Sequence, residues 1–157
     1  MAYSATDGDS VRWLIFQVGS RLCALPLPHI VETMRPLPIE RLSRAPHFVK
    51  GMAIIRGTPL PVVHLGSLFG EDAGEPQRLV TVAIGRRFIA LAVDRIIGIR
   101  PIHGEVSADL PPLLREADGD MVSAIGTLDS EFLFFLQTAL ILPQNLLADI
   151  DPKGQLQ

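Results

Sequence analysis

The residue types that most often carry chemistry are scattered along this chain rather than gathered into a motif. Its histidines have neither the i, i+4 spacing nor the other short spacings of a metal-binding pair. They are His29, His47, His64 and His103. We therefore predict no metal site. His64 ends an otherwise apolar run, where we expect a structural histidine held by a hydrogen bond.

The nucleophiles and acids give no catalytic pattern either. The sequence contains no Gly-x-Ser-x-Gly elbow and no Gly-x-x-x-x-Gly-Lys phosphate loop. Cys23 is the single cysteine, which excludes an internal disulfide, and its apolar neighbours predict an inert core thiol. Aspartates near predicted turns are expected to be solvated, namely Asp94, Asp118, Asp120 and Asp129. We predict no catalytic residue, no cofactor and no enzymatic activity.

Arginine beside apolar surface is the more informative feature. Arg56-Gly57 lies between two apolar runs, and Gly57 permits a tight turn with positive φ that presents the Arg56 side chain outward. Further arginines accompany a Pro-rich segment at 35–47, namely Arg35, Arg41 and Arg44. Arginine is favoured at protein interfaces because its planar fork pairs with carboxylates and its stem packs on apolar groups. The pattern therefore favours a surface that binds other proteins.

Composition excludes several classes of partner. The chain has 157 residues and a formal net charge of −3, which does not suit a broad nucleic-acid-binding face. No apolar run approaches the length of about 18 residues that a membrane-spanning helix needs, so we expect no direct membrane insertion. The first ten residues do not resemble a signal peptide, and we expect a cytoplasmic protein. Hydrophobic residues make up 48% of the chain, and we expect partners to bury some of them.

The chain predicts many short strands, because its 13 Pro and 13 Gly leave little room for long helices. A hairpin at 11–18 and 21–27 is followed by strands at 30–34, 48–56 and 58–65, and a polar linker at 71–77 comes next. The pattern then restarts. An offset of 66 residues sets Gly19 on Gly85, and an offset of 73 sets Leu60 on Leu133. We interpret this as two copies of one β unit of about 70 residues.

The repeat predicts an all-β fold of two small tandem five-stranded barrels that share a core, because barrel closure removes exposed sheet edges. We expect one domain at 11–148. Subdomain one covers about 11–70 plus C-terminal contributions, and subdomain two covers about 78–140. Short helical pieces, a C-terminal helix from about Gln144 and flexible tails at 1–10 and 151–157 complete the expected architecture.

Three segments in order resemble the CheW-like domain family. They are Ile30 to Arg35 (IVETMR), Ala45 to Gly51 (APHFVKG) and Arg56 to Val63 (RGTPLPVV). In the second half, Ala90 to Ile97 and Ile125 to Leu128 resemble further family segments more weakly. The resemblance covers about residues 12–148.

The resemblance implies two SH3-like barrels and a non-enzymatic adaptor. Members of this family couple the cytoplasmic tips of chemoreceptors to the regulatory domain of the histidine kinase CheA, within membrane-associated arrays. Receptor helices would lie in the groove between the two subdomains, and kinase contacts would use apolar ends of both barrels. The partner-binding positions that it implies are Ile30, Glu32, Arg35, Phe48, Arg56 and Gly57.

The chain departs from the family pattern at three polar positions. Ile54 replaces an Asn, His64 replaces an Asp, and Gln137 stands where the second half has an Asp. We expect the fold to survive, since the apolar pattern is intact, and partner affinity to differ. Two alternatives stay open at this point, a small-molecule-binding or hydrolytic β-barrel, and a detached kinase regulatory domain of the same fold.

Overall fold

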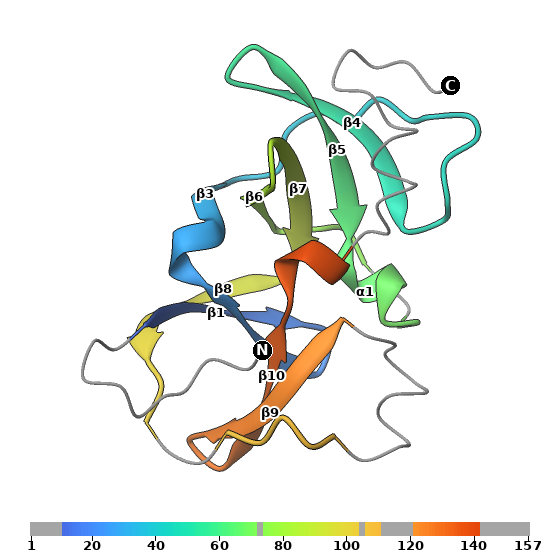
Figure 1. Ribbon diagram of the computed structural model, residues 1–157. Helices are drawn as coiled ribbons and strands as arrows, with labels where there is room; N and C mark the ends of the chain where they lie inside the picture. Colours follow the sequence, from blue (N-terminus) through green and yellow to red (C-terminus); the bar gives the residue numbers. More distant parts are fainter. Residues whose placement is uncertain (1–10, 72–73, 104–105, 111–120, 142–157) are drawn as a thin grey trace.

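The computed structural model describes residues 11–71, 74–103, 106–110 and 121–141 (Figure 1). Strands dominate this part of the chain, as the sequence predicts. They are β1 (Arg12–Val18), β2 (Arg21–Pro26), β3 (Ile30–Met34), β4 (Val49–Ile55), β5 (Thr58–His64), β6 (Arg78–Ile84), β7 (Arg87–Val93), β8 (Arg95–Pro101), β9 (Val122–Leu128) and β10 (Glu131–Leu136). The all-β prediction is confirmed.

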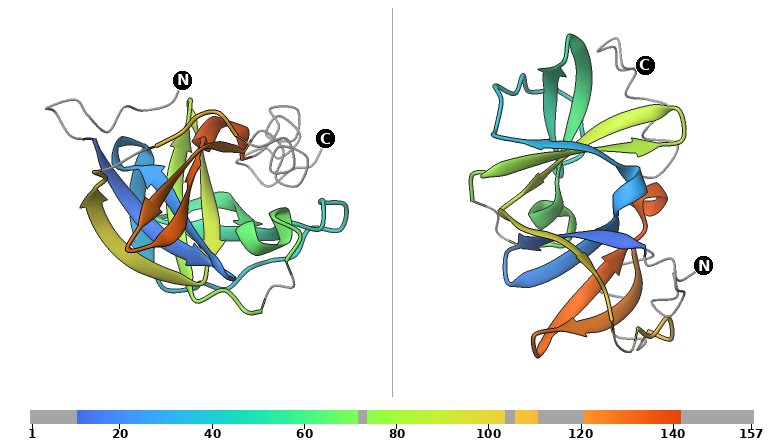
Figure 2. Two further views of the ribbon diagram at one scale, coloured as in Figure 1. Left: turned by 90° about the horizontal axis from the view of Figure 1, so that it is seen from below. Right: turned by 90° about the vertical axis from the view of Figure 1, so that its left-hand side faces the viewer.

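The strands form two five-stranded sheets that take strands from both halves of the chain. Sheet A has the order β8-β1-β2-β10-β9, and sheet B has the order β3-β6-β7-β5-β4. The two orders are equivalent under the repeat, because β1 to β5 correspond to β6 to β10. The predicted subdomains, about 11–70 plus C-terminal contributions and about 78–140, follow the order of the repeat, whereas the sheets mix strands of both halves. Each sheet combines the opening hairpin of one repeat with the last three strands of the other (Figures 1 and 2).

Parallel pairing produces this exchange. Strand β2 pairs in parallel with β10, and β5 pairs in parallel with β7, whereas the other strand pairs are antiparallel. A parallel pair needs a long crossover connection. Here the chain passes through β3 to β9 between β2 and β10, and through α1 and β6 between β5 and β7. The two sheets stack as two bodies with their central hairpins facing each other (Figure 2).

Strand β1 is buried on both faces. Trp13 and Ile15 pack inside sheet A with residues of β9 and β10. Leu14 and Phe16 point to the opposite face, where they join a core built from both sheets. Successive side chains of a strand alternate between its two faces, so a strand that is covered on both sides needs apolar residues at every position.

Strand β7 of sheet B is also buried on both faces. Ala90 and Ala92 lie inside sheet B, and Ile89 and Leu91 lie in the core between the sheets. Double burial thus accounts for the continuous apolar runs of the sequence without a partner protein. Cys23 lies in the same shared core and is fully buried, as predicted.

The hairpin turns of the two repeats share one unusual backbone conformation. Arg56 and Gly57 have φ values of 53° and 80°, and Asp129 and Ser130 have φ values of 49° and 69°. Two consecutive residues with positive φ are typical of the type I′ turn, whose twist matches that of the flanking strands. The predicted tight turn at Gly57 is confirmed. Arg56 itself adopts the left-handed region, and its side chain is 80% exposed.

The helical pieces are short. A 3-10 turn, η1 (Leu27–His29), precedes β3, helix α1 (Leu65–Leu68) follows β5, and a second 3-10 turn, η2 (Thr138–Leu140), follows β10. The expected C-terminal helix from Gln144 and the expected tails at 1–10 and 151–157 lie outside the described residues. Within the described part, no helix has the length and hydropathy needed to cross a membrane.

His64 is the last residue of β5 and the N-cap of α1, and it is buried, with 2% of its surface exposed. Its Nδ1 accepts a hydrogen bond from the Ser67 backbone N–H at 3.1 Å, and its Nε2 lies 3.3 Å from the Gly74 carbonyl oxygen. Nδ1 accepts, so the ring proton belongs on Nε2, which donates to Gly74. The imidazole thus supplies the N-terminal cap that a short acidic side chain gives elsewhere. The predicted structural, hydrogen-bonded role of His64 is confirmed.

Truncation inside the shared core tests whether the two sheets depend on each other. Phe16→Ala is expected to lower the free energy of unfolding by about 3–5 kcal/mol, since Phe16 is fully buried between the sheets. Urea unfolding followed by circular dichroism measures this loss. Phe132→Ala is the matched control, because Phe132 is 68% exposed, and it should change stability by less than about 0.5 kcal/mol. Equal losses for the two variants would contradict the shared core.

Acidification is expected to destabilise the fold through His64. Burial lowers the pKa of His64 below its ordinary value of 6.5, so the folded chain favours the neutral ring. The resulting stability is fully present above the unfolded pKa and is lost as the pH falls through the folded pKa. In His64→Asn the cap acceptor remains but does not titrate. Urea unfolding at about pH 7.5 and about pH 5.5 should show a smaller fall in stability for the variant than for the natural chain. An identical fall in both proteins would exclude His64 as the source.

Candidate functional site

The described residues contain no group of three or more His, Cys, Asp and Glu side chains that could hold a metal ion. Their most specific polar contact is an ion pair between Glu32 on β3 and Arg56 in the β4–β5 turn. Arg56 Nε donates to Glu32 Oε1 at 3.0 Å, and Arg56 Nη2 donates to Glu32 Oε2 at 2.8 Å. Such a two-pronged contact fixes orientation as well as distance.

The position of Glu32 is set by strand β6. The register of β3 against β6 shifts between Ile30 and Glu32, which leaves Val31 as the extra residue of a β-bulge. Next to the bulge, the Glu32 N–H donates to Thr81 Oγ1 at 3.1 Å, and the Thr81 hydroxyl donates to the Glu32 carbonyl at 3.3 Å. Thr81 is buried, so this double contact holds the Glu32 backbone in place.

The ion pair stands over an apolar hollow of about 300 Å³. Its lining comes from β3, β6, β7 and the β4–β5 hairpin. The lining residues are Val31, Glu32, Ile55, Arg56, Thr58, Leu60, Thr81 and Phe88. Two large apolar side chains of this lining remain open to solvent, Val31 at 53% and Phe88 at 47%. The hollow therefore offers an apolar floor with one charged pair at its rim.

The pair shifts the titration of both partners. Hydrogen bonding from Arg56 lowers the pKa of the Glu32 carboxyl, and hydrogen bonding to Glu32 raises the pKa of Arg56. Both side chains therefore stay charged across the physiological range. The contact is exposed, and exposed ion pairs add little to stability. Its value lies in holding the Arg56 side chain in one direction.

The pair also joins the two ends of sheet B, which begins with β3 and ends with β4. Sheet A has an equivalent contact between Arg100 on β8 and Asp129 in the β9–β10 turn, with Arg100 Nη1 3.5 Å from Asp129 Oδ2. Its charges are reversed relative to Glu32 and Arg56. Each sheet therefore has an ion pair between a strand and a turn, but the turn residue is basic in sheet B and acidic in sheet A.

The structure brings together some of the predicted partner-binding residues and separates others. Glu32 and Arg56 meet at the hollow, and Gly57 shapes the turn that carries Arg56 without lining the hollow itself. Ile30 is half-buried and packs against the shared core. Arg35 is exposed in the segment after β3.

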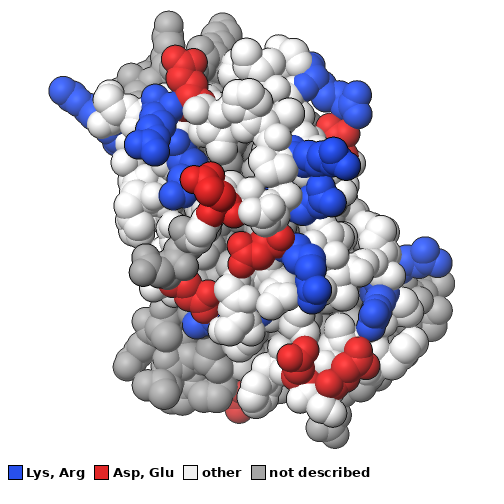
Figure 3. Space-filling model, turned by 180° about the vertical axis from the view of Figure 1, so that it is seen from behind, with Lys and Arg blue, Asp and Glu red and all other residues white. Residues whose placement is uncertain are grey.

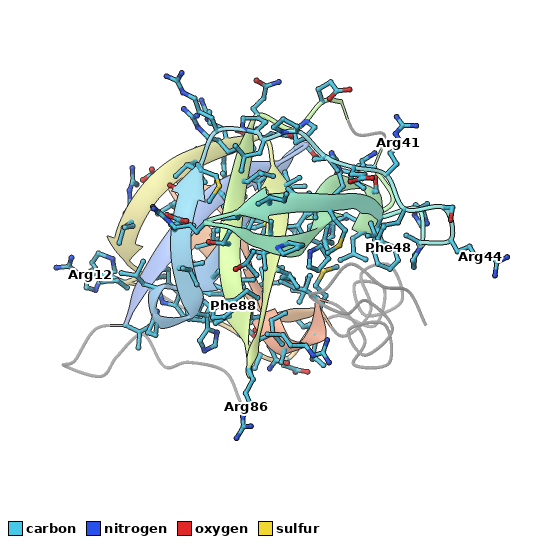
Figure 4. The ribbon with its side chains drawn as sticks, turned by 90° about the horizontal axis from the view of Figure 1, so that it is seen from above. Arg12, Arg41, Arg44, Phe48, Arg86 and Phe88 are labelled. Carbon is cyan, nitrogen blue, oxygen red and sulfur yellow. The ribbon has the colours of Figure 1, made fainter. Side chains whose placement is uncertain are left out.

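Phe48 lies apart from the hollow. It packs with Val49 and Met52 and makes an edge contact with His47 at 5.5 Å between ring centroids. Figure 4 shows it on the side of Arg44, away from Phe88. The hollow itself is formed within sheet B, whereas the expected groove lay between the two subdomains.

Sequence reasoning missed Val31, Thr81 and Phe88. Strand alternation alone does not show that Val31 is exposed, because the bulge shifts the register by one residue. Phe88 had a usable signal, since it follows the basic pair Arg86-Arg87 at the start of a strand that is otherwise apolar. Aromatic residues and arginine are enriched at protein interfaces.

Comparison with known proteins agrees with this architecture. The model of the CheW-like domain matches residues 12–145. The chain belongs to the CheW-like domain family. It is an adaptor of chemosensory signalling, as its relatives in this family are.

The relatives are distant in sequence and similar in length. The chemotaxis protein CheW of Klebsiella aerogenes is 20% identical over 153 residues, which cover 94% of this chain and 92% of that protein. Protein FrzA of Myxococcus xanthus is 28% identical over 116 residues (72% and 71%), and protein PilI of Pseudomonas aeruginosa is 24% identical over 135 residues (84% and 76%).

A solved structure shares the fold. The scaffolding protein TtCheW from Thermoanaerobacter tengcongensis superimposes with a TM-score of 0.75 and 21% identity, covering 84% of this chain and 92% of that chain. The predicted pair of five-stranded units thus agrees with a known CheW fold. The solved relative is described as a scaffolding protein.

Removal of the arginine tests the electrostatics of the site. Arg56→Met is expected to raise the pKa of the Glu32 carboxyl towards its ordinary value of 4.5, because the main cause of the lowering is the hydrogen bond from Arg56. Carboxyl carbon NMR over an acid titration measures this pKa. Arg100→Met is the control, because it removes the arginine of the corresponding ion pair in sheet A and should leave the pKa of Glu32 unchanged. A Glu32 pKa that is the same with and without Arg56 would contradict the contact.

Proposed function

We propose that this adaptor couples the cytoplasmic helices of chemoreceptors to the regulatory domain of a CheA-type histidine kinase, and that it does so without catalysis. The observation that carries the proposal is the hollow beneath the Glu32–Arg56 pair. An amphipathic helix docks by placing apolar side chains into such a groove. Val31, Phe88 and Leu60 offer it apolar contacts.

Arg56 gives the hollow a means of selecting its ligand. Glu32 engages Nε and Nη2, which leaves the Nη1 group of the guanidinium outside this ion pair. The side chain is 80% exposed and is held in one direction. A carboxylate on the docking helix can therefore pair with Arg56 and fix the register of that helix. The charge sets specificity, while the apolar floor supplies most of the contact area.

Association with receptors would place the chain at membrane-anchored arrays in the cytoplasm. The kinase would contact other apolar surface, at the ends of the two sheet units. The match to the Klebsiella CheW covers 92% of that protein, which supports an adaptor role. Apolar side chains fill the interior of both units, an arrangement that does not favour the alternative of a small-molecule barrel.

Charge reversal at the pair tests the proposal. Arg56→Glu is expected to weaken co-sedimentation with a receptor cytoplasmic fragment at least tenfold and to leave thermal unfolding nearly unchanged, because the pair is exposed. The double variant Glu32→Arg with Arg56→Glu restores an ion pair but places the wrong charge outward. It should not recover receptor binding.

Two controls make the result specific. Arg100→Glu changes the arginine of the corresponding ion pair in sheet A, where it lies on the strand rather than in the turn, and should bind the receptor fragment normally. Binding of the kinase regulatory domain should persist in Arg56→Glu, which shows that the variant is folded and competent. If Arg56→Glu binds the receptor fragment as tightly as the natural chain does at the same salt concentration, the proposal is wrong.

A further inference from the structure

A second surface, separate from the hollow of Glu32 and Arg56, lies on the outer edge of β4. Strand β4 is the last strand of sheet B, so its outer side lacks a neighbouring strand. One residue of the Pro-rich segment covers part of this edge. Glu40 and Met52 exchange two backbone hydrogen bonds of 2.8 Å, and the segment makes no further bridge along β4.

A glycine makes that approach possible. Gly51 has a φ of 145°, and a Cβ at this position would collide with the backbone of Glu40. The segment is therefore held against β4 at Gly51 and Met52. Beyond Met52 it leaves the edge uncovered, and Ile54 is 71% exposed.

The register shows which backbone groups of Ile54 face outward. Met52 stands opposite Pro61 and Ile54 opposite Pro59 in the β4–β5 ladder. Proline has no N–H, so neither pair can exchange two hydrogen bonds, and both must be non-hydrogen-bonded pairs. The N–H and C=O of Ile54 therefore point to the open side, as those of Met52 do.

No described residue completes the ladder at Ile54. The antiparallel bridge of Glu40 and Met52, continued by two residues, sets Pro38 opposite Ile54. Pro38 has no N–H to donate. Unpaired strand edges of this kind readily accept an additional strand.

The surroundings of Ile54 suit the side chains of an extended segment. A hollow of about 540 Å³ lies beside it, lined mainly by apolar residues, namely Leu37, Pro38, Glu40, Arg41, Leu42, Met52, Ile54 and Pro59. Ile54 stands where the family pattern that the sequence resembles has an Asn, and it adds an exposed apolar side chain to this surface.

Positive charge is concentrated next to this edge. Residues 35–50 contain four of the 14 Lys and Arg residues and one of the 17 Asp and Glu residues, although the whole chain carries −3. Arg35, Arg41 and Arg44 are exposed, and none of them takes part in an ion pair within the described residues. Figure 4 shows Arg41 and Arg44 projecting from the segment into solvent. The face shown in Figure 3 carries both acidic and basic side chains.

We propose that the open edge of β4 at Ile54, with its apolar hollow and Arg41, binds an extended acidic segment of a partner protein as an added strand. The backbone of the segment pairs with the N–H and C=O of Ile54. An apolar side chain enters the hollow, and a neighbouring carboxylate pairs with Arg41. This mode gives affinity through the backbone and selects side chains by alternation.

Three labelled peptides of one length test the proposal on the full chain. The first alternates Glu and Val, the second carries Lys in place of Glu, and the third is the acidic peptide with every Val nitrogen methylated. Fluorescence anisotropy should show the first peptide binding at least tenfold more tightly than the other two. Equal binding of the acidic peptide and its methylated form would overturn strand addition, because methylation removes backbone donors and keeps the charge.

Variants of the edge locate the site. Ile54→Pro removes the outward N–H and leaves the β4–β5 ladder intact, and Ile54→Asn restores the family residue and removes the apolar contact. Both, and Arg41→Glu, should weaken binding of the acidic peptide at least tenfold. Phe132→Ser is the control, because Phe132 is similarly exposed at 68% and lies on sheet A. Loss in Arg41→Glu with none in either Ile54 variant would reduce the site to general electrostatic attraction and contradict the proposal.

Hydrogen exchange separates a partner from the chain itself as the occupant. The Ile54 amide should exchange rapidly in the free protein and slow at least tenfold with the acidic peptide. An Ile54 amide that is already protected in the free protein would show that the chain covers its own edge, and would overturn the proposal.

Discussion

The burial of four central strands on both faces is the constraint on which this structure depends. Strands β1, β2, β6 and β7 carry one set of side chains into their own sheet and the alternate set into the core between the sheets. Separation of the two sheets would expose Phe16, Leu91 and their neighbours to water. Such exposure costs about 25 cal/mol for each Å² of apolar surface. The exchange of strands between the repeats strengthens this dependence, since each sheet is completed by the opposite half of the chain.

A frame held together at its centre leaves its outer ends available for other proteins. Arg56 and Asp129 lie in turns that follow the edge strands β4 and β9. An ion pair connects each of them to the other edge strand of the same sheet, β3 or β8. Exposed ion pairs contribute little to stability, so the charged turns can vary without loss of the fold. The bulge at Val31 and the open edge at Ile54 also leave surface available for other proteins. Both expose apolar side chains that the shared core does not use.

Much of this fold is predictable from the sequence, because strands, turns and repeats leave local signals. The hairpins around Gly19 and Gly85, the turn at Gly57 and the buried Cys23 all follow from residue type and alternation. The exchange of strands between the sheets cannot be predicted in this way. A repeat offset shows which segments are alike, but it does not show which of them pair. Glu32 and Arg56 were identified through the family resemblance and do meet. Phe48 shared that motif but faces a different cluster, and Val31 is exposed by a one-residue bulge that no alternation pattern reveals.

Methyl NMR of the full chain, with and without a receptor cytoplasmic fragment, tests the central claim most directly. The claim is that a rigid two-sheet frame presents the hollow of sheet B to a receptor helix. We predict that resonances of Val31, Ile55 and Leu60 shift on binding, while those of the shared core, such as Leu91 and Leu14, stay in place. Shifts that are confined to sheet A, at Ile99 or Leu133, or that spread through the shared core, would contradict this account.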